Sequence, residues 1–345
     1  MNFDEIREEF YKKHSEEEMQ DILYKLKSEP VTNVDIISDI GVNTTPILST
    51  WIDDLLYKAK RINNDMSPAE ALQSDECLNK ILSYIMTKPK FFGLKEESYY
   101  DTHEEYVHAV TNAVKTYFRN SQVSVVNATK VANFSPIAAK KIYEKYCPNF
   151  YATILDYSCG WGARMLGCLT SPYEYKYIGI EPNSKLNERL LKFSEWVCSS
   201  LHRENNTKLY LEGSEVFHEE LVNTVDLSFS SPPYFNLEIY CNEESQSANE
   251  NTSFKAWVNN YMIPTIQNIY KYTKVGGIHI VNLKNLSNAG KEPLLDVWIK
   301  ACLAVGFQLE TADYLVHQSR RQFDKGKNVK FTGDKEPIIV FKKIS

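Results

Sequence analysis

The sequence predicts an α/β protein, with a mostly parallel seven-stranded sheet in residues 121–345 and a helical N-terminal domain in residues 1–120. From Thr153 onward, short apolar segments alternate with helical ones, which is the pattern of parallel strands joined by crossover helices. Before residue 120 glycines are few, and apolar residues such as Ile6 and Phe10 recur at helical spacing. The two parts of the chain therefore predict different architectures.

In the N-terminal part, prolines mark the boundaries between helices. We expect helices near residues 3–11, 15–27, 49–61, 68–87 and 102–118. Pro30, Pro46 and Pro89 fall between them, as helix breakers do. Pro68 suits the first turn of its helix, where a missing N–H costs nothing. This region contains no repeat and no catalytic constellation, and its aromatic residues are expected in the core.

In the C-terminal part, the alternation gives an ordered series of elements. Strands are expected at 154–157, 177–181, 208–211, 225–229, 278–283, 308–316 and 336–342, with a short strand or extended segment at 122–126. Helices are expected at 137–146, after Gly162, at 184–200, 254–272 and 293–305. Because open α/β sheets bind ligands beyond the carboxyl ends of their strands, the loops after the strands are the places to look for a site.

Composition restricts the class of protein. The 345 residues are 43% hydrophobic and 24% charged, which is typical of a globular chain with one large or two unequal domains. No apolar run approaches the roughly 18 residues of a membrane span, and the acidic start is unlike a secretory signal. Seven scattered cysteines without a C-x-x-C pair favour a reduced, cytoplasmic compartment and no metal site.

The residues after the strand at 225–229 form the most informative segment of the chain. It reads Ser-Ser-Pro-Pro-Tyr at positions 230–234. Tandem prolines cannot donate backbone hydrogen bonds, so they end the strand and leave a stiff loop with open carbonyls. A small polar side chain before them could accept hydrogens from a planar amino group, and the aromatic ring after them could stack on its ring. A strand-ending turn with a core tyrosine is the purely structural alternative.

The loop after the first strand of the sheet carries Asp156, Gly160 and Gly162. Two glycines two apart, between a strand and a helix, let the backbone approach a ligand closely. The third glycine of a dinucleotide fingerprint would fall at Met165, so pyrophosphate binding is disfavoured. An acidic strand end with this spacing instead suits a positively charged nucleoside such as S-adenosylmethionine. The glycines alone would fit a tight structural turn equally well.

Glu181 strengthens the cofactor interpretation. It ends the second strand, 25 positions after Asp156, where a carboxylate can accept both hydroxyls of a ribose. Together the two strand ends favour a nucleoside cofactor over a structural turn.

Residues 120–345 resemble the S-adenosylmethionine-dependent amino-methyltransferases that modify DNA. The segment Phe134-Ser135-Pro136 resembles the family's Phe-x-Pro, the loop 156–162 its first cofactor motif, and residues 231–234 its catalytic motif. This resemblance implies the class I methyltransferase fold, a Rossmann-like sheet. It implies catalytic residues Ser231, Pro232, Pro233 and Tyr234, and cofactor-binding residues Phe134, Asp156, Ser158, Gly160, Gly162, Glu181, Pro182, Ser214 and Ser230.

The motif and the resemblance together predict methyl transfer to the exocyclic amino group of a base flipped out of double-stranded DNA. A serine at position 231 resembles the cytosine N4 enzymes, whereas Asp or Asn is commoner in the adenine N6 ones. Methylation at cytosine C5 is disfavoured because it needs a cysteine nucleophile, usually after proline, and only the reverse order, Cys147-Pro148, occurs. A modification enzyme of a bacterium or its virus, of the restriction-modification kind, is the expectation by resemblance, and a homodimer is compatible with it.

The net charge of −6 does not advertise nucleic-acid binding, so a local basic patch is needed. Residues 318–330 join the last two strands and are the candidate for phosphate contact. Their cations are Arg320, Arg321, Lys325, Lys327 and Lys330. The polar loop 236–251 is the candidate element over the flipped base. A solvated hairpin and a solvated insertion are the respective structural alternatives.

One departure from the family opens other functions. The catalytic motif follows the cofactor motif by only about 70 residues, so no large target-recognition domain fits between them. Methylation of RNA or of a protein glutamine therefore stays open, as does an inactive relative that only binds DNA or a partner protein.

Overall fold

The computed structural model describes residues 2–30, 37–38, 41–119, 125–235, 238–240, 251, 253–283, 285, 293–316 and 335–345. The chain forms two compact units. We call residues 1–15, 46–132 and 236–242 the helical unit, and residues 16–45, 133–235 and 243–345 the sheet unit. Each unit is built from segments that are distant in the sequence.

The helical unit contains most of the N-terminal helices. Its elements are α1 (Phe3–Phe10), α3 (Thr45–Leu56), β2 (Lys60–Arg61), α4 (Pro68–Gln73), α5 (Asp75–Thr87), the short 3-10 turn η1 (Glu97–Tyr99), α6 (His103–Arg119) and β7 (Glu238–Ile239). As expected, Pro68 opens its helix, and Ser67 and Glu70 form a capping box there. The single helix predicted over 68–87 is instead two, because Ser74 has an extended backbone and caps the second.

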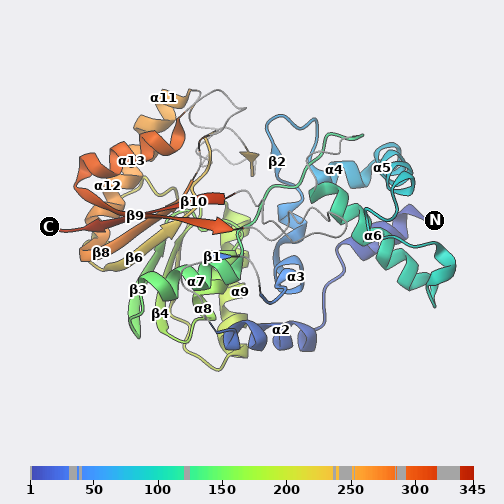
Figure 1. Cartoon of the computed structure of the whole chain (residues 1–345), viewed down its shortest axis with the longest axis horizontal. Coiled ribbons are helices and arrows are strands. Elements are labelled where there is room, and N and C mark those ends of the chain that lie inside the picture. The colour runs from blue at the N-terminus through green and yellow to red at the C-terminus, as the bar shows by residue number, and fades with distance from the viewer. Residues whose placement is uncertain are drawn as a thin grey trace, which may run out of the picture. The chain divides into compact units, whose positions relative to one another are not determined.

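In the sheet unit, the order of the strands in the sheet differs from their order along the chain. Its strands are β1 (Ile37–Ser38), β3 (Tyr151–Asp156), β4 (Glu174–Ile180), β5 (Thr207–Tyr210), β6 (Val225–Ser230), β8 (Thr273–Asn282), β9 (Phe307–Val316) and β10 (Lys335–Lys343). They lie in the order β1-β9-β10-β8-β6-β3-β4-β5, and β10 pairs antiparallel with both of its neighbours while the other pairs are parallel (Figure 1). This confirms the mostly parallel α/β sheet, with the two-residue β1 as an eighth strand at its edge.

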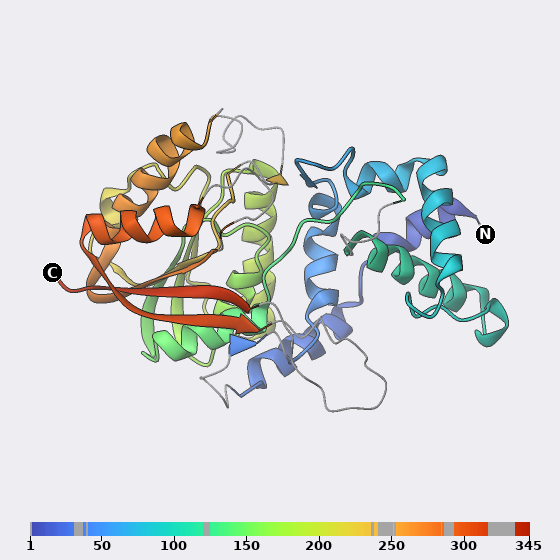
Figure 2. The same ribbon diagram turned by 45° about the horizontal axis from the view of Figure 1, so that its top comes forward.

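Helices cover both faces of this sheet, as the alternation predicts. They are α2 (Glu16–Ser28), α7 (Pro136–Tyr146), α8 (Ala163–Leu169), α9 (Ser184–Ser200), the 3-10 turn η2 (Glu219–Leu221), α11 (Phe254–Trp257), the π-helical segment η3 (Val258–Met262), α12 (Ile263–Tyr272) and α13 (Leu294–Val305). Helices α7, α8 and α9 lie on one face, and α12 and α13 on the other (Figure 2).

The boundary between the units differs from the predicted one between residues 120 and 121. Helix α2 belongs to the sheet unit, where Lys140 holds its C-terminal end. The Lys140 Nζ donates to the backbone oxygens of Leu26, Lys27 and Glu29 at 2.7, 2.9 and 2.9 Å. A lysine suits this position because the last carbonyls of a helix lack partners and carry partial negative charge. The predicted strand at 122–126 is absent at the described residues Val125 and Val126.

Two further predictions need correction in detail. Strand β8 begins at Thr273, five residues before the predicted start of the strand at 278–283. Gly276 lies in the strand with φ of 82°, a backbone conformation that residues with a side chain rarely adopt. The helix predicted over 254–272 has that extent, but η3 interrupts it just before Pro264. A proline cannot complete the hydrogen-bond ladder of an α-helix, which accounts for the local π-turn.

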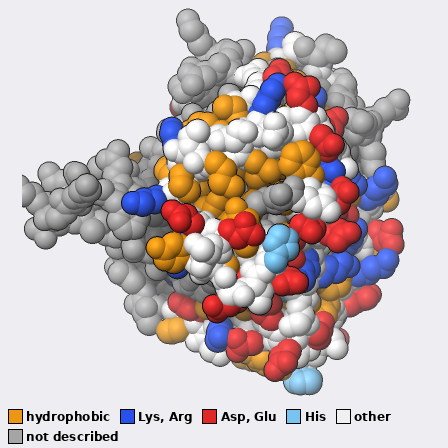
Figure 3. Space-filling model, turned by 90° about the vertical axis from the view of Figure 1, so that its right-hand side faces the viewer, with side chains coloured by type: hydrophobic (Ala, Val, Ile, Leu, Met, Phe, Trp, Pro, Cys, Tyr) orange, Lys and Arg blue, Asp and Glu red, His pale blue; other side chains and the backbone are white. Residues whose placement is uncertain are grey.

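Each unit has its own buried core. The core of the sheet unit lies between the sheet and α12 and α13, with Trp257, Trp298 and Tyr272 almost fully buried. The core of the helical unit gathers aromatic rings that include Phe10 of α1, Phe118 of α6 and Tyr57, which follows α3. On the face of the helical unit shown in Figure 3, apolar side chains lie among intermixed acidic and basic ones.

Candidate active site at the carboxyl edge of the sheet

Strands β3 and β6 bring the two most informative loops of the sequence together. They pair in parallel, with Ile154 opposite Leu227 and Leu155 opposite Ser228, so their loops begin side by side. Chain order runs outward from β3 to β5 on one side and from β6 to β8 on the other, which makes this a topological switch point. The Ser230 Oγ donates to the backbone oxygen of Ser158 at 3.2 Å, directly joining the two loops.

The carboxylate of Asp156 is held inside the protein. It is fully buried, and Arg164 binds it through Nε at 2.8 Å and Nη2 at 3.1 Å. The hydroxyl of Tyr177 donates to it at 2.9 Å. Burial by itself lowers the pKa of Arg164, but the charge and hydrogen bonds of Asp156 raise this pKa by more than burial lowers it. The guanidinium therefore stays charged. The Asp156 carboxylate therefore accepts hydrogen bonds from Arg164 and Tyr177 inside the protein.

Arg164 connects this buried pair to both loops. Its Nη2 also donates to the backbone oxygen of Ser158 and, at 3.3 Å, to Ser230 Oγ. Its guanidinium lies 5.8 Å from the ring centroid of Phe134, within cation–π range. The sequence analysis assigned no role to Arg164. The signal was present, since an arginine stands among the apolar residues of a short helix that is buried along its length.

The two glycines of the β3 loop are needed at their positions for different physical reasons. Both have positive φ, 51° at Gly160 and 77° at Gly162, which disfavours other residues. A Cβ at Gly162 would lie 2.6 Å from Leu190, so this glycine permits close packing on α9. A Cβ at Gly160 would meet nothing closer than 3.9 Å. Gly160 is therefore the glycine that leaves space open at the edge of the sheet.

Glu181 lies at the end of β4, next to Gly160. Its two carboxylate oxygens accept the backbone N–H groups of Asn183 and Gly160, each at 3.0 Å. Burial raises the pKa of Glu181 to about 7, and the two backbone hydrogen bonds oppose this shift. The side chain is thus a preoriented acceptor whose charge changes near neutral pH. Pro182, which follows it, is half-buried.

Ser158 and Ser214 come from different loops but meet the same tyrosine. The Tyr261 hydroxyl lies 3.1 Å from Ser158 Oγ and 3.4 Å from Ser214 Oγ. Tyr261 belongs to η3 and is 5% exposed. The sequence analysis missed it because nothing in the helical pattern of residues 254–272 distinguishes this tyrosine from a core residue.

The segment after β6 is less buried than the residues at the ends of β3 and β4. Ser231, Pro233 and Tyr234 are half-buried, while Pro232 is buried. Among the described residues, no side-chain hydrogen bond of Ser231 is found. Tyr234 packs at the rim of the core of the sheet unit.

Phe235 closes this segment with an unusual backbone. Its φ is 50°, which is uncommon for a residue with a side chain and is often found at functional sites. Its ring contacts Phe254 and Trp257, with centroids 5.8 and 6.1 Å away. The next residues, from 236, belong to the helical unit, where β7 pairs antiparallel with β2.

Several predicted residues cannot be placed. Residues 317–334, and with them Arg320, Arg321, Lys325, Lys327 and Lys330, lie outside the described residues. Of the polar loop 236–251, only residues 238–240 and 251 are described.

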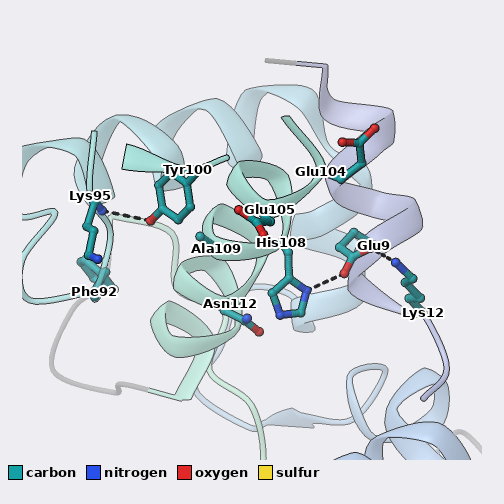
Figure 4. Close-up of a pocket in the computed structure, with 11 residues that line it drawn as sticks. Glu9, Lys12, Phe92, Lys95, Tyr100, Glu104, Glu105, His108, Ala109 and Asn112 are labelled. Carbon is teal, nitrogen blue, oxygen red and sulfur yellow. Dashed lines mark hydrogen bonds and ion pairs between the residues drawn. The ribbon is translucent and has the colours of Figure 1, made fainter. Parts of the chain in front are cut away.

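The helical unit contains a hollow with a volume of about 600 Å³. Glu9, Lys12, His108 and Tyr100 are among its lining residues (Figure 4). The polar groups here bind one another: Glu9 pairs with His108 at 2.6 Å and with Lys12 at 3.1 Å, and the Tyr100 hydroxyl accepts the Lys95 backbone N–H at 3.1 Å. We assign no chemistry to this hollow.

Within the described ranges, no cluster of three or more His, Cys, Asp or Glu side chains could hold a metal ion. The same residues include no helix long and apolar enough to cross a membrane.

Comparison with known proteins agrees with the fold. No family model matches the chain, and no curated protein matches it. Similar solved structures include a TehB-like SAM-dependent methyltransferase from Corynebacterium glutamicum (15% identity, 59% of this chain and 86% of that chain, TM-score 0.35). Others are a SAM-dependent O-methyltransferase from Thermotoga maritima (11%, 63% and 68%, 0.41) and a SAM-dependent methyltransferase from Methanosarcina mazei (13%, 59% and 97%, 0.40).

The sheet unit has the class I methyltransferase fold. This assignment rests on the strand order and on the single antiparallel strand β10, since the likeness to each of these structures is low. The edge that carries Gly160, Glu181 and Ser158 is where this fold class binds ligands.

Proposed function

We propose that this protein uses S-adenosylmethionine to methylate the exocyclic amino group of a base in DNA, with cytosine N4 as the first target and adenine N6 as the second. The observation that carries the proposal is the pairing of β3 with β6. It sets the Asp156–Gly162 loop beside Ser231–Tyr234 at one edge of the sheet. A methyl donor and its acceptor must lie next to each other, and this edge offers adjacent places for both.

The residues on the β3 and β4 side fit the cofactor. Gly160 leaves space for a nucleoside, and Glu181 presents a carboxylate to the hydroxyls of its ribose. Ser158 and Ser214 add hydroxyl groups from two loops, and Phe134 and Pro182 are assigned to the same site by the resemblance. Asp156 is assigned there too, but through Arg164: the pair fixes the loop and does not bind the cofactor directly. When bound, S-adenosylmethionine supplies a methyl group on a positively charged sulfur.

The residues on the β6 side fit a planar amino group. An exocyclic amine is a weak nucleophile because its lone pair is delocalised into the ring. If the Ser231 hydroxyl and the Pro232 carbonyl accept its two N–H hydrogens, the nitrogen becomes more pyramidal and its lone pair more available. Stacking on Tyr234 fixes the ring. The nitrogen would bond to the methyl carbon while the methyl–sulfur bond breaks, so that S-adenosylhomocysteine leaves with that electron pair. The nitrogen would then lose one proton to solvent, with no covalent intermediate on the enzyme. Orientation and electrostatics supply the rate.

A duplex substrate requires the base to leave the stack, which costs roughly a few kcal/mol and is offset by stacking and hydrogen bonds in the site. The half-buried Tyr234 is the stacking partner in this proposal. The basic residues Arg320, Arg321, Lys325, Lys327 and Lys330 are proposed to contact phosphates.

The test is transfer of a labelled methyl group from S-adenosylmethionine to DNA, RNA and total protein in parallel. We expect label in DNA, sensitive to Ser231→Ala and not to Ser199→Ala, an exposed serine on α9 of the same unit. Label in RNA or protein alone would keep the reaction and replace the substrate. No transfer to any of them would reject the proposal.

A further inference from the structure

We propose that Tyr261 is a positioning residue that makes Ser158 and Ser214 hydrogen-bond acceptors toward the cofactor, and thereby selects its adenine amino group. The inference rests on the proposed function, since it concerns the same site. It arises from a chain of four hydroxyl groups that joins the β3 loop, the loop after β5 and the helix before β8.

The chain is continuous. From one end to the other it links Thr265 to Ser214 at 3.0 Å, Ser214 to Tyr261 at 3.4 Å, and Tyr261 to Ser158 at 3.1 Å. Ser158 Oγ then donates to the backbone oxygen of Tyr157 at 2.8 Å. Thr265, Ser214 and Tyr261 are buried, and Ser158 is half-buried.

Each hydroxyl has one hydrogen, so the direction of the chain follows from counting. The Ser158 hydrogen goes to Tyr157, and Tyr261 must therefore donate to Ser158. The Ser214 hydrogen goes to Tyr261, and Thr265 must therefore donate to Ser214. All four bonds point the same way, an arrangement in which each bond polarises the next. Ser158 and Ser214 have no hydrogen left for a ligand, only lone pairs.

The geometry of Tyr261 is fixed from the protein side. Its ring packs on the buried Trp257, with centroids 5.2 Å apart. Tyr261 lies in the π-helical segment η3, which ends two residues before Pro264. Thr265 lies four residues after Tyr261 along the helix. Isolated π-turns occur frequently at functional sites, because they change which side chains face one direction. Burial also raises the pKa of the Tyr261 hydroxyl, which keeps it protonated as the chain requires.

The consequence is selectivity. The proposal places the adenine amino group of the cofactor against Ser214 Oγ. There Ser214 can accept a hydrogen from the amino group, but it cannot donate to the ring oxygen of hypoxanthine, the deaminated base. If Tyr261 loses its hydroxyl, the Ser214 hydrogen is released and can turn toward the ligand. Ser214 then serves either base.

The experiment measures the binding of S-adenosylhomocysteine and of its deaminated analogue, S-inosylhomocysteine, by calorimetry on the full chain. We expect the wild type to prefer the adenine form by about tenfold or more, and Tyr261→Phe to reduce that preference by about tenfold, the size of one exchanged hydrogen bond. Thr265→Val should keep the preference, since Ser214 still donates to Tyr261. Tyr175→Phe is the matched control, because Tyr175 is a buried tyrosine whose hydroxyl bonds to the Cys147 backbone.

Equal losses of affinity for both ligands in Tyr261→Phe would overturn the proposal, as would the same change of preference in Thr265→Val. If Tyr261→Phe does not fold, a Ser214→Ala variant must remove the preference in its place, and a preserved preference there would also overturn the proposal. Failure of the proposed function has a different result: no binding of S-adenosylhomocysteine by the wild type at millimolar concentration.

Discussion

The two sides of the candidate site differ in how deeply their residues are buried. On the β3 and β4 side, Asp156, Arg164 and Glu181 are buried and joined by hydrogen bonds to neighbouring loops. On the β6 side, Ser231 and Tyr234 are half-buried, and the chain passes through the positive φ of Phe235 into the other compact unit. The first side is buried within the sheet unit, and the second is followed along the chain by residues of the helical unit.

This difference suits the two ligands of the proposed reaction. A cofactor that is bound in every cycle gains from a preorganised site, because little ordering then opposes binding. A base that must enter from a polymer needs a segment that can adapt. In the helical unit, β7 pairs with β2 and begins only three residues after Phe235, so β7 is close in sequence to the substrate side of the site. Changes on the two sides should therefore have separable effects.

The largest expected effect is on the buried ion pair. Arg164→Met leaves the carboxylate of Asp156 buried without its charged partner, which should cost about 3–5 kcal/mol of unfolding free energy. Urea denaturation measures this. Lys192→Met breaks an exposed pair with Glu188 and should have a much smaller effect, because solvent screens such pairs. Equal costs for the two variants would mean that the β3 side is not organised around Arg164.

The next effect concerns turnover. Ser231→Ala removes one hydrogen-bond acceptor from the amino group and should lower the methyl-transfer rate by about 10²–10³-fold, as loss of a transition-state hydrogen bond does. The affinity for S-adenosylhomocysteine should not change, because Ser231 lies on the substrate side. Single-turnover rates and calorimetry separate the two quantities. Weakened cofactor binding with a normal rate would show that the two sides have been assigned the wrong way round.

A smaller effect is expected from pH through Glu181. Since burial raises its pKa to about 7, the folded protein binds this proton more tightly than the unfolded chain. Stability without cofactor should thus fall as pH rises from about 4.5 to about 7. If ribose hydroxyls donate to the ionised carboxylate, the affinity for S-adenosylhomocysteine should increase as the pH is raised toward about 7. The increase should be up to about tenfold for each pH unit.

Calorimetry across this pH range tests the prediction, with Glu181→Gln as the control that should bind weakly and without the pH dependence. An unchanged pH profile in that variant would assign the titration to another group.

The smallest effect on stability is expected at β7. Ile239→Pro removes a backbone donor from a two-residue pairing and should change the unfolding free energy by less than about 1 kcal/mol. Turnover should nevertheless fall by about tenfold, the counterpart of 1.4 kcal/mol, because the segment after Phe235 is anchored there. Cofactor affinity is the internal control and should stay constant. A normal rate would mean that the segment after β6 does not depend on the pairing of β7 with β2.

Local patterns predicted most of the fold. The helix at Ser184–Ser200 and the strands after Thr153 follow from apolar periodicity and from prolines and glycines, which act within a few residues. The assignment of α2 to the sheet unit could not be predicted in this way, because it depends on Lys140, more than a hundred residues later. The same holds for the site. The strand-end motifs are local, whereas the bond of Arg164 to Ser230 and the meeting of Tyr261 with two serines arise only from tertiary packing.

Mass spectrometry of nucleosides from the DNA of cells that express the wild type, beside cells that express Ser231→Ala, tests the central claim most directly. We expect N4-methylcytosine, or else N6-methyladenine, with the wild type and neither with the variant. Equal amounts of the methylated base in both, or none in either when both proteins are present and folded, would contradict methylation of a DNA amino group at this site.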